Sequence, residues 1–394
     1  MAREIIITVY LFVFRTLFYI FNLFPQKKKT TFVASFGDNV LYTIEEIEKQ
    51  TDDQVVILQT SQCKVNFDNA SDRMILDFET FNLVDWGKSI YHLATSQHIF
   101  VDNYFGFLAV TNFRPNVSCI QLWHAAGAVK QFGLKDPSVE RRSQRANERF
   151  QKVYQRFDYV IVGSEKMSSI FMESFGITHE QILRSGIPRT DFFFDEAAKK
   201  HVERSLRTEF PKINDKKVIL YAPTYRDDQL NITNIELNID QMYEELKDDY
   251  ILLLRLHPAM KVELNNEYPD FIIDVSKYQN LNHLLIITDL LITDYSSIPF
   301  EFSLLNKPMI FFAYDLNEYA NSRGFWEDYQ DFIPGPIVDD TDSLIRCIKE
   351  GLFDLSQIKS FADQWNQYSR GYSSKQLIKS IYAQDGAYKV VDQV

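Results

Sequence analysis

The strongest constraint on the fold is an alternation of short apolar runs with longer helical stretches, which occurs twice along the chain. In the first half, the runs have the length and composition of buried strands and lie at 31–36, 55–58, 99–101, 119–123 and 159–162. Helical stretches separate them near 42–50, 88–97 and 138–157. Strands that alternate with helices pair in parallel, because each helix returns the chain to the same end of the sheet. The first half therefore predicts an α/β doubly wound unit.

The second half repeats this pattern. Its strand-like runs lie at 218–221, 251–256, 272–273, 290–292 and 309–312, and its helical stretches lie near 238–248, 298–306 and 341–351. A chain of 394 residues exceeds the usual size of a single core, so two domains are expected. Two Rossmann-like domains facing one another would place a cleft between the carboxyl ends of their sheets.

The domain boundaries follow from the polar stretch 196–217, which we interpret as the linker. We expect a membrane-associated helix at 1–29, an N-terminal Rossmann-like domain at 30–200 and a C-terminal Rossmann-like domain at 201–394. The last helical stretch, near 357–383, is a candidate to cross back to the first domain.

Composition excludes several function classes. A net charge of −12 argues against a broad nucleic-acid surface, which needs a large positive footprint. The three cysteines, Cys63, Cys119 and Cys347, are odd in number and far apart, which indicates a reducing compartment. The cysteines and histidines show no zinc-ligand spacing, so neither a structural metal nor a metal cofactor is expected.

Residues 5–24 are almost continuously apolar and nearly long enough to span a bilayer. Thr8, Arg15 and Asn22 recur every seven residues and would form a narrow polar stripe along a helix. We interpret the segment as a helix in the membrane interface, held to anionic headgroups on the cytoplasmic side by the lysines at 27–29. The alternative is a first helix docked on the protein's own core.

The stretch QLWHAAGAVKQFG at 121–133 delivers a histidine from the end of a predicted strand into small residues. The thin backbone around His124 would let a ligand approach closely, with Lys130 as a nearby counter-charge. The alternative is a structural histidine in a tight turn.

Three predicted strands of the second half end in polar residues, in the segments 221–227, 254–258 and 293–301. Ser296 and Ser297 precede a helix whose first-turn N–H groups favour a phosphate, although either serine would also serve as a simple cap. Glu301 lies one turn further and is placed to accept hydrogen bonds from ribose hydroxyls, or to act only as a favourable charge near the helix start. A second histidine, His257, would stand opposite His124 and share proton transfer at a phosphoryl centre.

Two further patterns favour structural interpretations. Arg141, Arg145, Arg149, Lys152 and Arg156 have helical spacing, but acidic residues interrupt this basic stripe, which favours a solvated helix face over a pyrophosphate or membrane site. The DxD spelling at 340–342 precedes a helical stretch, so its aspartates are expected to cap a helix rather than to bind a metal.

With these motifs assembled, the chain resembles the CDP-glycerol glycerophosphotransferase family of wall teichoic acid synthesis, and within it the glycerol-phosphate primase branch. The motifs that carry the resemblance are DNYF at 102–105, WHAAG at 123–127, KQFGLKD at 130–136, VGSE at 162–165, YAPTYRD at 221–227, HP at 257–258, TDYSSIPFE at 293–301 and NKP at 306–308. The resemblance implies a metal-independent GT-B fold that is peripheral to the cytoplasmic membrane.

The resemblance also implies residue roles. It makes His124 the general base and places His257 at the donor phosphates. The remaining matched positions bind the donor, with the serine pair at its diphosphate and a carboxylate role for Glu301; they are Arg189, Pro223, Thr224, Arg255, Ser296, Ser297 and Glu301. Ala125 and Ala126 depart from the His-Gly-Thr spelling of many members, which removes a hydroxyl near the donor and makes acceptor preference harder to transfer.

The reaction implied is transfer of glycerol 3-phosphate from CDP-glycerol to N-acetylmannosamine of an undecaprenyl-diphosphate-linked disaccharide, with release of CMP. The alternatives are a related transferase that extends the linkage, polymerises or uses CDP-ribitol, and a catalytically silent CDP-alditol-binding membrane protein. Other teichoic acid enzymes are candidate partners.

Overall fold

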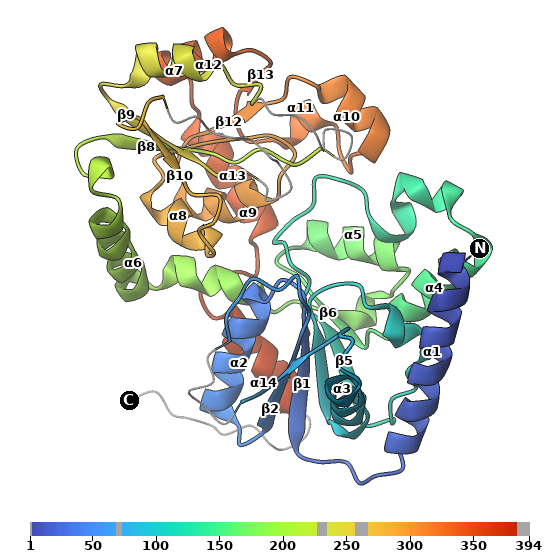
Figure 1. The fold of residues 1–394 in the computed structure, drawn as a ribbon. Helices are drawn as coiled ribbons and strands as arrows, with labels where there is room; N and C mark the ends of the chain where they lie inside the picture. Colours follow the sequence, from blue (N-terminus) through green and yellow to red (C-terminus); the bar gives the residue numbers. More distant parts are fainter. Residues whose placement is uncertain (1, 68–72, 227–234, 257–266, 384–394) are drawn as a thin grey trace. The chain divides into compact units, whose positions relative to one another are not determined.

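The computed structural model describes residues 2–67, 73–226, 235–256 and 267–383. It contains two compact units: Met1–Ala125 with Phe132–Asp191 and Gln367–Val394, and Ala126–Gln131 with Phe192–Asn366. Each unit has one parallel sheet with helices around it (Figure 1), which confirms the predicted α/β class. Along the chain the change of unit falls after Asp191, compared with the predicted domain boundary at residue 200. The stretch 196–217, interpreted from the sequence as the linker, is largely a helix at Glu196–Glu209, because its polar residues form an exposed helix surface.

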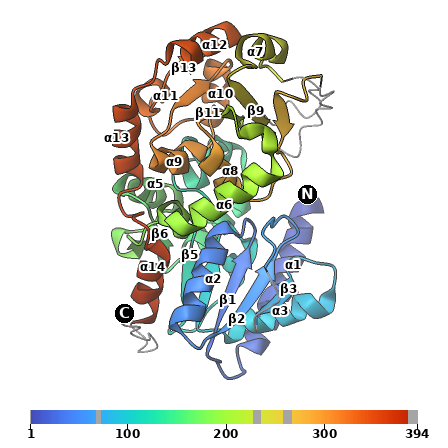
Figure 2. The ribbon, with the colours of Figure 1, turned by 90° about the vertical axis from the view of Figure 1, so that its left-hand side faces the viewer.

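The first unit is built on a seven-stranded sheet of order β3-β2-β1-β4-β5-β6-β7. Its strands are β1 (Lys29–Ala34), β2 (Gln54–Gln59), β3 (Met74–Asp77), β4 (His98–Val101), β5 (Ser118–Gln121), β6 (Tyr159–Ile161) and β7 (Ile182–Leu183). On one face α2 (Asp38–Gln50) lies beside α14 (Ser373–Tyr382), and on the other lies α3 (Leu83–Thr95) (Figures 1 and 2). Further along the chain are α4 (Gln144–Tyr154) and α5 (Glu165–Phe175). The strand order reverses direction between β1 and β4, the point where doubly wound sheets bind ligands.

The second unit has a six-stranded sheet of order β10-β9-β8-β11-β12-β13. Its strands are β8 (Lys217–Tyr221), β9 (Tyr250–Leu254), β10 (Ile272–Asp274), β11 (Leu290–Thr293), β12 (Met309–Phe312) and β13 (Ile337–Val338). Its helices are α6 (Glu196–Glu209), α7 (Ile239–Leu246), α8 (Leu281–Ile287), α9 (Ile298–Phe302), α10 (Leu316–Arg323), α11 (Tyr329–Phe332), α12 (Thr341–Glu350) and α13 (Leu355–Trp365). The helices α7 and α12 pack side by side over one apolar core (Figure 1). The switch in strand order falls between β8 and β11.

Three expected helical stretches are shorter or broken. The stretch expected near 357–383 is two helices, α13 and α14. The stretch expected near 138–157 is a 3-10 turn at Pro137–Arg141 followed by α4, because the Ser143 hydroxyl accepts a hydrogen bond from the Ala146 N–H and starts a new helix. The stretch expected at 298–306 is α9 followed by a 3-10 turn at Ser303–Leu305. Arg141 is therefore not on the same helix as Arg145.

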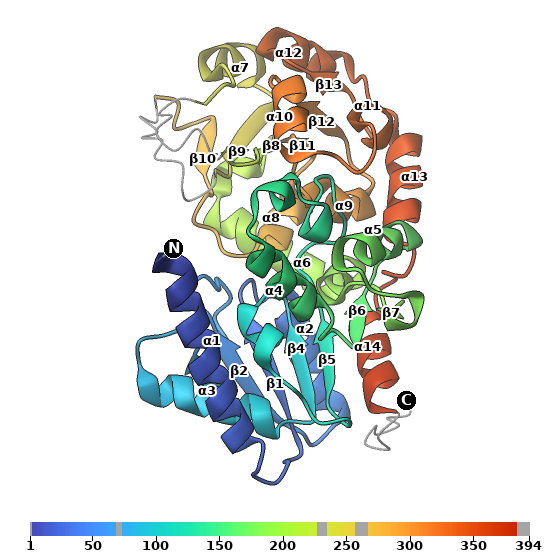
Figure 3. The same cartoon turned by 90° about the vertical axis from the view of Figure 1, so that its right-hand side faces the viewer.

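The N-terminal helix α1 (Ala2–Phe21) combines features of both sequence interpretations. Phe14 and Phe18 are 0% and 3% exposed, and the Phe14 ring lies against Trp86 of α3 and Phe107. The opposite face is open to solvent, with Phe12 and Tyr19 each 70% exposed. Figure 3 shows α1 running along the outside of the first unit beside α3. In the described part of the chain, Glu4–Phe21 is the one helical stretch long and apolar enough to cross a membrane.

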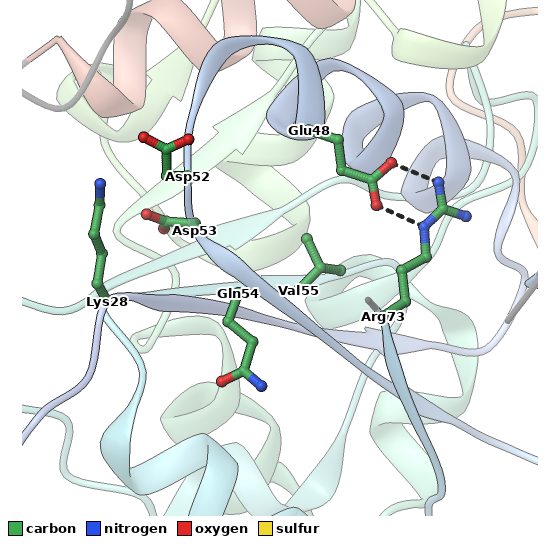
Figure 4. Close-up of a pocket in the computed structure, with 7 residues that line it drawn as sticks. All are labelled: Lys28, Glu48, Asp52, Asp53, Gln54, Val55 and Arg73. Carbon is green, nitrogen blue, oxygen red and sulfur yellow. Dashed lines mark hydrogen bonds and ion pairs between the residues drawn. The ribbon is translucent and has the colours of Figure 1, made fainter. Parts of the chain in front are cut away.

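A cavity of about 780 Å³ lies at the amino ends of β1 and β2 in the first unit. In Figure 4, the Arg73 guanidinium forms two hydrogen bonds to the Glu48 carboxylate, both 2.6 Å long. The remaining lining residues are Lys28, Asp52, Asp53, Gln54 and Val55. In this unit, the motifs that carry the resemblance lie at the carboxyl ends of the strands, which is the opposite edge of the sheet from this cavity.

We expect Phe14→Ala to destabilise the protein by about 3–5 kcal/mol, because it empties a buried aromatic site. The matched control is Phe12→Ala on the exposed face of the same helix, which should change stability by less than about 0.5 kcal/mol. The measurement is the urea midpoint of each variant. Equal midpoints for the two variants would show that α1 is not docked on its Phe14 side.

Candidate active site

His124 follows β5 through a sharp turn that three polar contacts hold. The Trp123 backbone has a φ of 54°, a left-handed conformation that is unfavourable for a residue with a bulky side chain. The Gln121 side-chain oxygen accepts a hydrogen bond from the Trp123 N–H at 2.8 Å. The Asn39 amide of α2 donates to the Leu122 and Trp123 carbonyls, at 3.3 and 2.9 Å. These contacts offset the strain and direct the chain at His124.

The His124 ring is oriented by the main chain of Asp102. Its Nδ1 lies 3.3 Å from the Asp102 carbonyl oxygen. Because a carbonyl only accepts, Nδ1 carries the proton, and Nε2 retains its lone pair in the neutral ring. Burial lowers the pKa of His124 to about 4, against the opposing effect of the Asp102 hydrogen bond, and the charge of Arg189 adds to the lowering. At neutral pH the ring is therefore a proton acceptor at Nε2.

Asp102 is buried directly after β4, and its carboxylate closes the turn that follows β1. Its oxygens accept the N–H groups of Ser35, Phe36 and Gly37 at 2.8, 2.9 and 2.8 Å. Burial raises the pKa of Asp102 to about 6, although these three donors act in the opposite direction. Because β1, β4 and β5 are neighbours in the sheet, Asp102 joins the turn after β1 to the His124 loop at the switch point.

Arg189 lies in the same part of the first unit as His124. Its backbone N–H donates to the Asn39 side chain at 3.1 Å, and its guanidinium Nη1 lies 3.8 Å from Asp38 Oδ2. The amide of Asn39 thus contacts the Trp123 and Arg189 main chains at once. The structure brings these two predicted site residues together at the N-terminus of α2, a cationic position suited to an anionic ligand.

Lys130 lies within the second unit, in the segment Ala126–Gln131. Its ammonium lies 3.2 Å from the Tyr319 hydroxyl, and the segment is held by the Trp326 N–H, which donates to the Val129 carbonyl at 3.2 Å. A Cβ at Gly127 would lie 2.3 Å from the Phe300 ring, so only glycine fits there. The small residues of the motif therefore allow close packing of the backbone.

A buried ionic network holds the switch point of the second unit. The Arg226 guanidinium is paired with Asp294 at 2.9 Å and with Asp315 at 2.7 Å, and it lies over the rings of Tyr295 and Tyr319. The three charged residues come from the loops after β8, β11 and β12, and Tyr319 lies on α10. None of the three was assigned a role from the sequence: Arg226 and Asp294 lie in the motifs named above, whereas Asp315 lies in none of them. The available signal was that Asp294 directly follows a buried strand.

Asp294 connects the two loops on either side of the switch point. Its Oδ1 accepts the Thr224 N–H and the Tyr295 N–H, both at 2.7 Å. The Thr224 hydroxyl is buried and, among the described residues, has no hydrogen-bond partner. A buried hydroxyl without a partner is costly unless a ligand satisfies it. Pro223, beside it, is half-buried.

The serine pair lies at the start of α9, as predicted. Ser296 accepts a hydrogen bond from the Ile298 N–H at 3.2 Å, while the Ser297 side chain makes no capping hydrogen bond. Both are half-buried. Glu301 is buried, with 3% of its surface exposed to solvent.

Two more predicted positions belong to the loop after β9. The Arg255 guanidinium donates to the Tyr278 carbonyl at 2.6 Å, on the side of β10. His257 lies outside the described residues, so its role stays a prediction.

Of the two patterns given structural interpretations, the aspartates cap a helix as expected, but the basic residues do not share one helix face, because Arg141 lies in a 3-10 turn and Arg156 follows α4. The Asp340 carboxylate accepts the Ser343 N–H at 2.6 Å and caps α12, which confirms the capping interpretation. In the basic stripe, Arg149 is paired with Glu4 of α1 at 3.4 Å, and Arg156 donates to the Asn112 side chain at 3.5 Å. Two of the five basic side chains of this stripe therefore already have polar partners within the protein.

Comparison with known proteins identifies the family of the chain. Residues 17–383 match the family described as CDP-Glycerol:Poly(glycerophosphate) glycerophosphotransferase. The chain is 39% identical over 384 residues to the teichoic acid glycerol-phosphate primase of Bacillus subtilis (strain 168), covering 96% of this chain and 98% of that protein. It is 41% identical over 315 residues to the teichoic acid poly(ribitol-phosphate) polymerase of Bacillus spizizenii (strain ATCC 23059 / NRRL B-14472 / W23), covering 77% of this chain and 49% of that one.

A solved structure of the wall teichoic acid polymerase TagF is similar with a TM-score of 0.80 and 25% identity, over 98% of both chains. This similarity confirms the predicted GT-B type of fold. Taken with the family match and the identities over nearly the whole length, it shows that the chain belongs to the CDP-glycerol glycerophosphotransferase family.

Proposed function

We propose that the protein transfers one glycerol 3-phosphate from CDP-glycerol to the N-acetylmannosamine of an undecaprenyl-diphosphate-linked disaccharide and releases CMP. The observation that carries the proposal is the neutral His124 ring, whose Nδ1–H is engaged by the Asp102 carbonyl and whose Nε2 is left to accept a proton. The match to a primase over 98% of that protein's length supports transfer to a primer rather than chain extension.

In the proposed reaction, Nε2 of His124 takes the proton of the acceptor hydroxyl as its oxygen attacks the glycerol-bearing phosphorus. The new P–O bond forms as the bond to the CMP oxygen breaks, so charge moves to the leaving phosphate. His257 acts at this phosphate as the second histidine. Arg189 and Lys130 supply positive charge for the anionic donor. Positioning and charge stabilisation account for most of the rate enhancement.

The second unit is proposed to hold the nucleotide at its switch point. The partnerless Thr224 hydroxyl and the uncommitted Ser297 side chain are donors suited to phosphate or ribose oxygens. Pro223, Arg255, Ser296 and Glu301 complete the proposed donor site. The buried Arg226 is already paired with two carboxylates, so we assign it to holding the loops rather than to binding substrate.

The exposed face of α1 is proposed to lie on the cytoplasmic face of the membrane. Its apolar residues include Ile6, Phe12 and Tyr19, which are 68%, 70% and 70% exposed. Lys27 and Lys28 follow the helix, are exposed and suit anionic headgroups. Lys29, which was also expected to bind headgroups, is instead buried at the start of β1, where its ammonium donates to the Thr95 hydroxyl. This placement would keep the protein at the surface that carries a lipid-linked acceptor.

One alternative function has specific support. The identity to a poly(ribitol-phosphate) polymerase leaves a CDP-ribitol donor or repeated transfer as the second candidate. Interactions with other teichoic acid enzymes remain a prediction.

For the catalytic base, we expect His124→Ala to lower kcat by about 10²–10⁴-fold, the usual contribution of a positioned general base. The binding of CDP-glycerol, measured by calorimetry, should be unchanged within about twofold. The matched control is His201→Ala, which removes an exposed histidine of α6 and should keep full activity. Full activity of the His124 variant would refute the base assignment.

For the product, we expect purified protein, CDP-[14C]glycerol and a synthetic lipid-diphosphate disaccharide to give a product with one glycerol phosphate. Mass spectrometry of the lipid counts the units added. Many units would support a polymerase, transfer from CDP-ribitol alone would support the ribitol alternative, and binding without CMP release would support a silent binding protein.

For the membrane surface, we expect Lys27→Gln with Lys28→Gln to weaken binding to phosphatidylglycerol vesicles by about 30-fold, since each of the two basic residues near the surface contributes about 1 kcal/mol. The matched control is Lys199→Gln with Lys200→Gln on α6 of the second unit. Vesicle co-sedimentation measures both. Equal loss in the two double variants would argue against the proposed surface.

A further inference from the structure

The His124 imidazole is enclosed between two aromatic rings. Its centroid lies 4.0 Å from that of Phe36, with 8° between the ring planes, and 4.3 Å from that of Trp123, with 30° between the planes. Two nearly parallel rings at these distances on one face would overlap each other, so they cover opposite faces. The imidazole therefore presents its edge, and not its faces, to an incoming molecule.

Phe36 is fixed by the same turn that Asp102 closes. Its own N–H donates to the Asp102 carboxylate, and so do the N–H groups on either side of it in the chain. Gly37 has a φ of 94°, and a Cβ there would lie 2.7 Å from the Val65 side chain, so the turn has little freedom. The Phe36 side chain is nevertheless 41% exposed, which is unexpected for a large ring that served only the core.

We propose that Phe36 is a positioning residue for His124. Its ring and the Trp123 ring fix the plane of the imidazole, while the Asp102 carbonyl fixes the rotation within that plane by accepting from Nδ1. Together they direct the Nε2 lone pair along one line. The inference rests on the proposed role of His124 as the base that deprotonates the acceptor hydroxyl.

The stack also affects the protonation of His124. Burial is the main cause of its lowered pKa, and Phe36 covers one face of the ring. Four other titratable or charged groups surround this loop. They are the Asp102 carboxylate, the paired side chains of Arg189 and Asp38, and the Cys63 thiol next to the turn. Removal of the Phe36 ring leaves these four groups in place and admits water to one imidazole face.

The test is Phe36→Leu, which keeps an apolar side chain but removes the ring, compared with Phe36→Tyr, which keeps the ring. We expect the leucine variant to lose about 10–100-fold in kcat, as is typical of a misplaced catalytic group, with KM for CDP-glycerol within twofold of the wild type. The tyrosine variant should retain activity. The matched control, Phe81→Leu, changes a fully exposed ring of the same unit and should have no effect.

The pH profile separates positioning from a loss of structure. Only the neutral ring accepts a proton, so activity is lost as the pH falls through the pKa of His124, which is about 4 in the wild type. With water at one face, this acidic limb should move up toward the usual value of about 6.5 in Phe36→Leu but not in Phe36→Tyr. If the leucine variant is too unstable for kinetics, the titration of the His124 ring proton by NMR gives the same comparison.

Two outcomes would overturn the inference: a kcat within twofold of the wild type in Phe36→Leu, or an acidic limb that stays where it was. These failures differ from a failure of the proposed function. If His124→Ala is inactive while Phe36→Leu is normal, the base assignment stands and only the positioning role is lost. If His124→Ala is active, the base assignment itself is wrong.

Discussion

A buried aspartate after a strand, bonded to the backbone of the neighbouring loop, is the constraint on which both candidate sites depend. In the first unit Asp102 follows β4 and accepts three N–H groups of the turn after β1. In the second unit Asp294 follows β11 and accepts the Thr224 N–H of the loop after β8. Each pair of strands borders the switch point of its sheet. A carboxylate there accepts hydrogen bonds from backbone N–H groups that would otherwise lack a partner, and so it fixes the loop that carries functional side chains.

The two aspartates are stabilised differently: Asp294 by an ion pair and Asp102 by backbone N–H groups. The Asp294 charge is balanced by the buried Arg226, which also joins Asp315 and lies over tyrosine rings. Removing one member of such a pair leaves an uncompensated charge, so the loops of the second unit are strongly held. Asp102 relies on neutral N–H donors, and burial raises its pKa to about 6. Burial, with a further contribution from the charge of Arg189, keeps the nearby His124 ring neutral.

The parts of the fold that could be predicted are those with a strong local pattern of apolar residues. The long apolar runs became β1, β2, β8 and β9 because buried parallel strands need continuous hydrophobic residues. Three short strands were not predicted: β7 and β13 have two residues each and β3 has four, which is too short for a clear periodicity. Helix lengths were overestimated where a local side-chain cap, such as Ser143, interrupts the pattern.

At the candidate sites, residues that follow strands could be predicted from the sequence, but the side-chain contacts that hold them could not. His124, Ser296 and Ser297 stand out because they directly follow apolar runs. The stack of Phe36 on His124 joins residues 88 positions apart, and the pairing of Arg226 with Asp315 spans 89. Contacts of this kind depend on sheet order, which one sequence does not determine.

The packing of α1 affects how the protein would reach a lipid-linked acceptor. A helix that crosses a bilayer has lipid or other membrane helices around it. Phe14 and Phe18 of α1 instead face the first unit, beside α3, whose sheet carries His124. If α1 crossed the bilayer, the polar surface of that unit would have to enter the hydrocarbon with it. The cost of burying so many polar groups favours the interfacial orientation, in which α1 is half in protein and half in lipid.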